Sequence, residues 1–254
     1  MQGKGHGPLP QQASKERNLT RKPGMNPSST GRSDRFSDHL RKLVVPIWDA
    51  QHNHPFVKGV GDGTLDLEKL KHWVRQDYVY LIDYARVLST ASARAPDLDT
   101  MTWFASLARA VLKIEMSLHR SYAADFGITE EELEREQKAP TCQGYTDFLM
   151  RAATAEPFEV LVAALLPCFW GYHELGTRLE DQGLPDKELY ARWIKQYTDP
   201  DYGREVERCR VLMDRLGADA SQELKGRMEQ AFITSSRYEY LFWEMCYTLQ
   251  TWPV

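Results

Sequence analysis

The stretch LEKLKHWVRQDYVYLIDYARVLSTASA (67–93) best indicates how the chain folds. Its apolar residues recur at alternating steps of four and three, which is the spacing of one face of an α-helix. The stripe is Leu70, Val74, Asp77, Leu81, Tyr84 and Leu88, in which Asp77 is the one charged member. No stretch of comparable length alternates apolar and polar residues with period two. The sequence therefore predicts helices and no strand.

The same helical period recurs on both sides of this stretch. Residues 36–52 are expected to form a first helix, kinked at Pro46 because proline removes a backbone hydrogen bond. HPFVKGVGDGT (54–64) is expected to be a glycine-rich connection, and Thr129 and Glu132 form the pattern of a capping box. Further helices are expected at 99–126, 144–155, 157–182, 187–198, 200–216 and 219–250. We therefore expect an all-α bundle with one core over residues 34–254.

Residues 1–33 differ in composition from the rest of the chain. They contain five Gly, four Pro and six Lys or Arg but a single acid, Glu16, and almost no large apolar residue. Such a segment cannot bury enough surface to offset the entropy of ordering it. We expect a disordered basic tail over residues 1–33, within which Met25 is an alternative beginning of the chain.

Composition and charge exclude several classes of protein. The net charge of −4 and the pI near 6.0 argue against a general nucleic-acid binder, which carries a basic patch. The longest stretch without Asp, Glu, Lys, Arg or His covers residues 160–172, whereas a membrane-spanning helix needs about 20 residues. The four cysteines are widely spaced and form no CxxC pair, so no disulfide framework or structural zinc site is indicated. We expect reduced thiols in a cytoplasmic protein.

Three chemically active side chains fall on the apolar faces of predicted helices. Asp77 lies in the middle of the stripe of 67–93, and Glu239 lies on the face of the last helix. Cys168 belongs to the stripe Leu161, Leu165, Tyr172, Leu175 and Leu179. A buried carboxylate without a partner costs several kcal/mol, so each acid needs a partner or a task. An ion pair, a tyrosine or Arg237 could satisfy the acids, and plain packing could account for the thiol.

The proline at position 167 favours a functional role for Cys168. Pro167 removes the backbone hydrogen bond to the Ala163 carbonyl and bends the helix immediately before the thiol. A distorted helix beside an inward-facing thiol is typical of a functional site.

Four segments carry a resemblance to a known family. LLPCFWGYHELG (165–176) resembles the cysteine segment of the TenA family, the thiaminase II or aminopyrimidine aminohydrolase enzymes. HPFVKGVGDGTL (54–65), RQDYVYL (75–81) and SSRYEYLFWEMCY (235–247) resemble its other segments in the same order. The likeness covers about residues 36–253. It implies a haem-oxygenase-like α-bundle, assembled as a homotetramer, that uses no cofactor.

The resemblance also implies a role for each matching residue. Cys168 matches the nucleophile, Asp77 the acid that holds the pyrimidine, Glu239 the general acid, and Tyr80 the tyrosine that supports the thiol. The residues that match the lining of the substrate pocket are Tyr145, Tyr172, Tyr197 and Phe242. The implied reaction is hydrolysis of 4-amino-5-aminomethyl-2-methylpyrimidine to the hydroxymethyl compound, with thiamin hydrolysis as a second activity.

The residues alone leave two other functions possible. A di-metal carboxylate oxidase would use pairs such as His52 with His54 or Glu115 with His119, but no His follows His173, and such sites draw ligands from several helices. The alternative for Glu115 and His119 is a pair on a solvated helix face. A non-catalytic binding or regulatory bundle is the second possibility.

Two further cysteines are candidates for chemistry. Cys209 lies between Arg208 and Arg210, which could lower the pKa of its thiol. It also belongs to an apolar stripe with Val206 and Met213, which favours plain packing. Cys142 lies near the expected pocket loop and receives no role.

Overall fold

The computed structural model describes residues 35–254, and this part of the chain is helical and contains no strand. The prediction of an all-α fold is thus confirmed. The expected tail at residues 1–33 lies outside the described residues. The helices are α1 (Phe36–Leu43), α2 (Val45–His52), α3 (Pro55–Gly61), α4 (Leu67–Arg94), α5 (Leu98–Ala110), η1 (Val111–Glu115), α6 (Met116–Asp125), α7 (Glu130–Glu134), α8 (Pro140–Ala155), α9 (Phe158–Asp181), α10 (Glu188–Thr198), α11 (Pro200–Asp219) and α12 (Gln222–Thr248).

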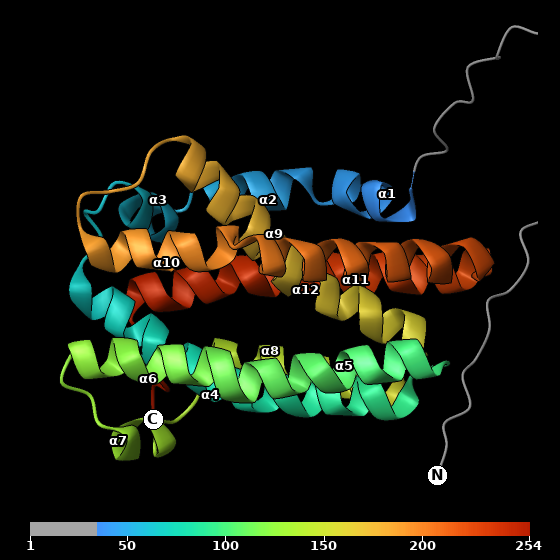
Figure 1. Cartoon of the computed structure of the whole chain (residues 1–254), viewed down its shortest axis with the longest axis horizontal. Helices are drawn as coiled ribbons and strands as arrows, with labels where there is room; N and C mark the ends of the chain where they lie inside the picture. The colour runs from blue at the N-terminus through green and yellow to red at the C-terminus, as the bar shows by residue number, and fades with distance from the viewer. Residues whose placement is uncertain (1–34) are drawn as a thin grey trace, which may run out of the picture. The chain divides into compact units, whose positions relative to one another are not determined.

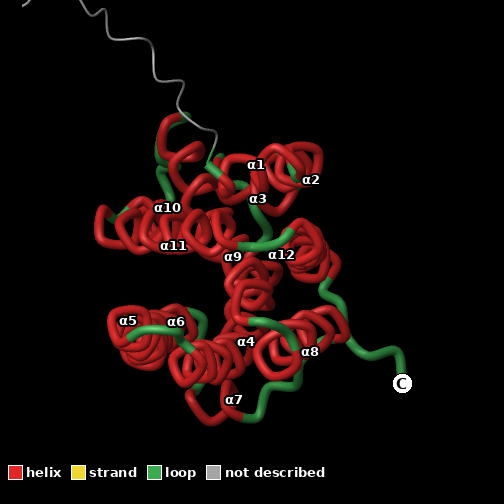
Figure 2. The backbone as a smooth tube through the Cα atoms, turned by 90° about the vertical axis from the view of Figure 1, so that its right-hand side faces the viewer, coloured by secondary structure: helices red, strands yellow, loops and turns green. Residues whose placement is uncertain are grey.

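Two long helices, α4 and α9, lie at the centre of the bundle (Figures 1 and 2). Helix α9 packs against α12, α10 and α11, and α4 packs against α5 and α8. The two central helices also contact each other and α12. Asp77 on α4, Cys168 on α9 and Glu239 on α12 therefore come from three helices that pack together.

The first expected helix is divided in two. Val44 separates α1 from α2, and Pro46 lies within the first turn of α2. Proline is tolerated there because the first amide groups of a helix have no partner within the helix. The expected kink at Pro46 is therefore a break two residues earlier, at Val44.

The expectation of a connection at 54–64 is wrong, because this segment contains helix α3. The His54 side chain accepts a hydrogen bond from the Phe56 amide and caps the helix, and Pro55 occupies its first position. Gly63, at φ 73°, forms the turn that follows. Capping and a first-turn proline outweigh the low helix propensity of the glycines in so short a helix.

The expected helix 99–126 contains a π-helical turn, η1, between α5 and α6. It ends near Gly127, whose φ of 72° is readily adopted by glycine. The capping box of Thr129 and Glu132 is present at the start of α7. None of the helices in residues 35–254 combines the length and apolar character needed to cross a membrane.

A close approach of α9 and α10 depends on one glycine. A Cβ atom at Gly176 would lie 2.8 Å from the Cβ atom of Tyr197, which is closer than side chains tolerate. Gly176 thus lets α10 lie against α9 with Tyr197 directed toward the centre of the bundle, where its side chain is buried.

Candidate active site

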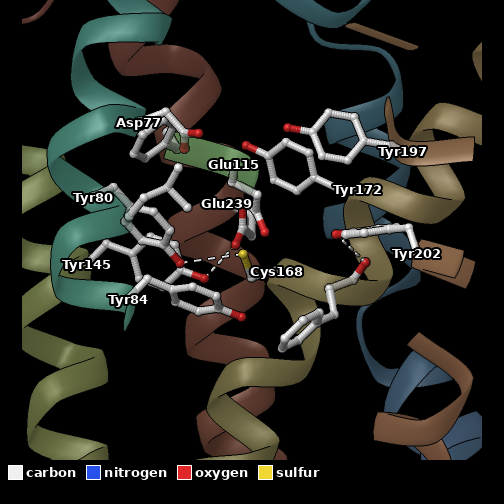
Figure 3. A pocket seen from close by; sticks show the side chains of 13 residues that line it. Asp77, Tyr80, Tyr84, Glu115, Tyr145, Cys168, Tyr172, Tyr197, Tyr202 and Glu239 are labelled. Carbon is white, nitrogen blue, oxygen red and sulfur yellow. Dashed lines mark hydrogen bonds between the residues drawn. The ribbon is translucent and has the colours of Figure 1, made fainter. Parts of the chain in front are cut away.

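A pocket at the centre of the bundle brings together residues from α4, η1, α8, α9, α10, α11 and α12 (Figure 3). All eight residues assigned to the site from the sequence line it. The full lining is Asp77, Tyr80, Leu81, Tyr84, Glu115, Tyr145, Cys168, Phe169, Tyr172, Tyr197, Tyr202, Glu239 and Phe242. Polar atoms and flat aromatic rings therefore share one cavity.

Cys168 projects into the pocket from α9, in the turn that follows Pro167. The Tyr80 hydroxyl donates a hydrogen bond to its Sγ atom over 3.5 Å. Burial raises the pKa of the Cys168 thiol well above its ordinary value, and the bond from Tyr80 opposes this only in part. The thiol is therefore neutral at neutral pH.

Glu239 is nearly sealed from solvent, with 3% of its surface exposed. Tyr145 Oη lies 2.5 Å from Glu239 Oε1 and 2.9 Å from Ser235 Oγ. Ser235 Oγ in turn donates to the carbonyl oxygen of Ala164 over 2.7 Å. Burial raises the pKa of Glu239 to about 8, although hydrogen bonds from Tyr145 and Cys168 lower it.

Counting hydrogen atoms in this chain of contacts supports a neutral Glu239. The hydroxyl groups of Tyr145 and Ser235 carry one hydrogen each, which makes two. The three contacts Glu239–Tyr145, Tyr145–Ser235 and Ser235–Ala164 need three hydrogens. If Glu239 is ionised, Tyr145 donates to it and Ser235 donates to Ala164, which leaves the Tyr145–Ser235 contact without a hydrogen. A proton on Glu239 supplies the third hydrogen, so the geometry favours the protonated acid.

Asp77 contacts a histidine that sequence reasoning placed on the surface. Its Oδ2 atom lies 2.6 Å from His119 Nε2, and His119 Nδ1 lies 2.9 Å from the carbonyl oxygen of Glu115. A carbonyl accepts only, so Nδ1 carries a hydrogen, and the imidazole can donate to Asp77 only as a cation. Burial lowers the pKa of His119, but the hydrogen bond and charge of Asp77 raise it more.

The expectation that Glu115 and His119 form a solvated pair is therefore wrong. His119 is 1% exposed and Glu115 lines the pocket. The wider π turn of η1 lets two consecutive residues, Glu115 and Met116, both face inward. A prediction based on a regular helix of 3.6 residues per turn cannot place both of these residues on the inward face.

Aromatic rings form most of the remaining lining. The ring centroids of Tyr172 and Tyr197 lie 4.7 Å apart, and those of Tyr80 and Tyr145 lie 5.3 Å apart. Phe242 makes an edge contact with Tyr80. Sequence reasoning did not assign Tyr84 and Tyr202 to the site, although Tyr84 follows Asp77 by seven residues on the same stripe and could have been included.

Comparison with known families identifies the family to which this chain belongs. The profile of the TENA/THI-4/PQQC family matches residues 41–249. The chain belongs to this family. Its fold and four segments agree with the resemblance read from the sequence, which is thereby confirmed.

Relatives in the TENA/THI-4/PQQC family include named enzymes and solved structures. The aminopyrimidine aminohydrolase of Halalkalibacterium halodurans is 39% identical over 85% of this chain and 97% of its own length. That of Bacillus subtilis is 37% identical over 86% of this chain and 92% of its own. The TenA homologue of P. horikoshii has a TM-score of 0.78 at 31% identity, covering 84% of this chain and 99% of its own. A haem-oxygenase-like domain from Shewanella denitrificans, at a TM-score of 0.66 and 12% identity over 83% of this chain and 91% of its own, shares the fold.

The other cysteines of this family member lie outside the pocket lining. Burial raises the pKa of Cys209 to about 12, so the neighbouring arginines do not activate it and packing accounts for it. Cys142 is buried, donates to the carbonyl oxygen of Gln76 over 3.5 Å, and has a raised pKa because of burial. Both thiols have the environment of core residues.

The histidine pairs considered as metal ligands have other partners. His54 caps α3 and contacts Glu244, and His52 lies beside Arg178. Within residues 35–254, no group of three or more His, Cys, Asp or Glu side chains is arranged to hold a metal ion.

Proposed function

We propose that this chain hydrolyses 4-amino-5-aminomethyl-2-methylpyrimidine to the hydroxymethyl compound, in salvage of the pyrimidine of thiamin. The names of the relatives, aminopyrimidine aminohydrolases at 37% and 39% identity, support this activity. The observation that carries the proposal is a thiol, Cys168, that shares an aromatic-lined pocket with Asp77 and Glu239. Such a pocket suits a flat heterocycle that must be bound, attacked and protonated.

Asp77 is the group that would bind and activate the ring. An aminopyrimidine presents a ring nitrogen beside an exocyclic amine, and a carboxylate can accept hydrogen bonds from both when the ring is protonated. The imidazole of His119, 2.6 Å away, orients the Asp77 carboxyl group. The rings of Tyr172 and Tyr197 offer surfaces for stacking.

Cys168 is the proposed nucleophile. Binding of a protonated ring places a positive charge beside the thiol, which favours the thiolate that burial disfavours. A sulfur–carbon bond forms at ring carbon C6, and the electron pair of the ring double bond moves to the protonated ring system, which loses aromaticity. Tyr80 holds the sulfur in place through its hydrogen bond.

Glu239 is the proposed general acid. The bond between the exocyclic methylene and the amine breaks, the electron pair leaves with nitrogen, and Glu239 supplies the proton that makes ammonia the product. A carboxyl with a pKa of about 8 holds that proton at neutral pH. Water then adds to the methylene group, the sulfur–carbon bond breaks, and the ring regains aromaticity.

Three further properties are proposed from the resemblance alone. They are a second, slower hydrolysis of thiamin, assembly as a homotetramer, and residence in the cytoplasm. Sedimentation of the purified chain tests the assembly, and fractionation of cells tests the location.

Incubation of the purified chain with the aminomethyl compound and with thiamin, followed by product identification, tests the function. We expect the hydroxymethyl compound from both and a higher kcat/KM for the amine. A preference for thiamin would overturn the salvage assignment, and binding without turnover would favour a non-catalytic protein. Activity that is lost on dialysis against a chelator and restored by iron or manganese would favour the di-metal oxidase.

A further inference from the structure

The pocket contains a third carboxyl group that the proposed reaction does not yet use. Glu115 reaches the pocket from η1, and Figure 3 shows its side chain between Asp77 and Cys168. Asp77 is paired with His119, and Glu239 with Tyr145. By contrast, we find no hydrogen bond to the Glu115 carboxyl group from the residues that the structure describes. A carboxyl group left without a partner in a pocket is available to a ligand or to water.

Glu115 is also less buried than Glu239. Most residues of the lining are buried, and those that keep partial exposure are Glu115, Cys168 and Tyr202. Glu239 is 3% exposed and lies inside the chain of contacts with Tyr145 and Ser235. Of the two glutamates, Glu115 is therefore the one that water from outside reaches more readily.

The two glutamates enter the pocket from different sides. Glu239 belongs to α12, whereas Glu115 belongs to η1 between α5 and α6. Figure 2 shows α5 and α6 on the opposite side of α4 and α9 from α12. One carboxyl group can therefore face the departing amine while the other faces the incoming water.

We propose that Glu115 is the general base that activates the water of hydrolysis. This inference rests on the proposed function, because it assigns a residue to the second half of that reaction. Three observations carry it: Glu115 keeps partial exposure, its carboxyl group has no hydrogen-bond partner within residues 35–254, and it belongs to a different helix from Glu239.

The step balances without any further reactant. After the amine has left, the exocyclic methylene carbon is electron-poor and the ring remains bonded to Cys168. Glu115 takes one proton from water as the oxygen–carbon bond forms, and the electron pair of the exocyclic double bond moves into the ring. The sulfur–carbon bond then breaks, the electron pair returns to sulfur, and the proton on Glu115 passes to solvent.

The acid–base properties of Glu115 agree with this assignment. Burial, followed by the charge of Asp77, raises the pKa of Glu115 to about 7, although His119 lowers it. A general base is most effective when its pKa lies near the working pH. Two carboxyl groups whose surroundings give them different pKa values can serve one as the general acid and the other as the general base.

Glu115→Gln tests the assignment. The variant should still release one equivalent of ammonia in a burst, because cleavage precedes the step that needs the base. The pyrimidine should then accumulate on Cys168, visible as a mass increase of the intact chain, while steady-state kcat falls by about 10²-fold or more. Azide, an anion that needs no deprotonation, should restore turnover and yield the azidomethyl pyrimidine.

Controls separate this inference from the proposed function. Glu180→Gln, an exposed position on α9, should leave the kinetics unchanged, and Cys168→Ala should show no adduct. The burst itself reports that Glu115→Gln is folded and competent. An unchanged kcat in Glu115→Gln, or loss of the burst together with turnover, would overturn the role of Glu115. A wild-type chain without activity on the amine would instead overturn the proposed function.

Discussion

The carboxylate of Asp77 and the imidazole of His119 form a buried pair, with Oδ2 and Nε2 2.6 Å apart. The second nitrogen of the imidazole is fixed by the Glu115 carbonyl, so the ring can serve Asp77 only as a cation. One helix, α4, thus provides the acid, and α6 provides the group that orients it. The ring of a bound pyrimidine would meet an acid that is already oriented.

His119→Asn should therefore weaken binding of the hydroxymethyl pyrimidine by about tenfold, the equivalent of ~1.4 kcal/mol. Asn cannot carry a positive charge, and its side chain does not reproduce the imidazole contact that orients Asp77. Calorimetric titration measures the effect, and Asp77→Asn should give a larger loss in the same direction. Unchanged affinity in His119→Asn would mean that Asp77 needs no support from the imidazole.

Cys168→Ala should lose nearly all turnover while the bundle still folds, because the thiol lines the pocket and supports no other element. Cys142→Ala and Cys209→Ala are the matched controls, since both thiols are buried outside the lining. They should keep much of the activity and lower the melting temperature slightly through lost packing. Steady-state assays and melting curves on the three variants test this, and full activity in Cys168→Ala would exclude covalent catalysis by that residue.

Glu239→Gln should damage the amine reaction more than the thiamin reaction. Only the amine needs a proton to leave, because the thiazolium of thiamin is already cationic. The amine rate of the wild type should fall as the pH rises through about 8, where Glu239 loses its proton. Competition kinetics with both substrates from pH 6 to 9 measure both effects. Equal losses on the two substrates would remove the general-acid role.

The raised pKa of Glu239 also predicts a pH dependence of stability. Between 4.5 and about 8 the folded chain holds a proton that the unfolded chain releases, so the free energy of unfolding falls as the pH rises through this window. Glu239→Gln removes this contribution. Relative to the wild type, the variant should gain on the order of 4 kcal/mol between pH 5 and pH 9. Denaturant unfolding at the two pH values measures the difference, and a constant difference would contradict a neutral Glu239.

Hydrophobic periodicity was sufficient to find Asp77, Cys168 and Glu239. Each lies on a regular helical face whose other members are apolar, so its inward direction follows from spacing alone. Their convergence on one pocket required the packing of α4, α9 and α12, and only the family resemblance suggested it before the structure.

Periodicity failed where the backbone departs from a regular α-helix. The π turn of η1 changes the direction of every residue that follows it, so Glu115 and His119 matched the spacing of a surface pair. Helix α3 was missed because it has too few residues for a hydrophobic pattern and because its cap is a histidine, His54. Short helices and irregular turns carry little periodic signal, and both lie close to functional residues here.

Gly176 has a consequence for how this pocket can change in evolution. The missing side chain lets α10 approach α9 closely enough for Tyr197 to form part of the pocket wall. Replacing its hydrogen with a methyl group would displace α10 and widen the cavity, although residue 176 is not part of the lining. A substitution at residue 176 could therefore change the size of substrate that this protein accepts, although residue 176 does not contact the substrate.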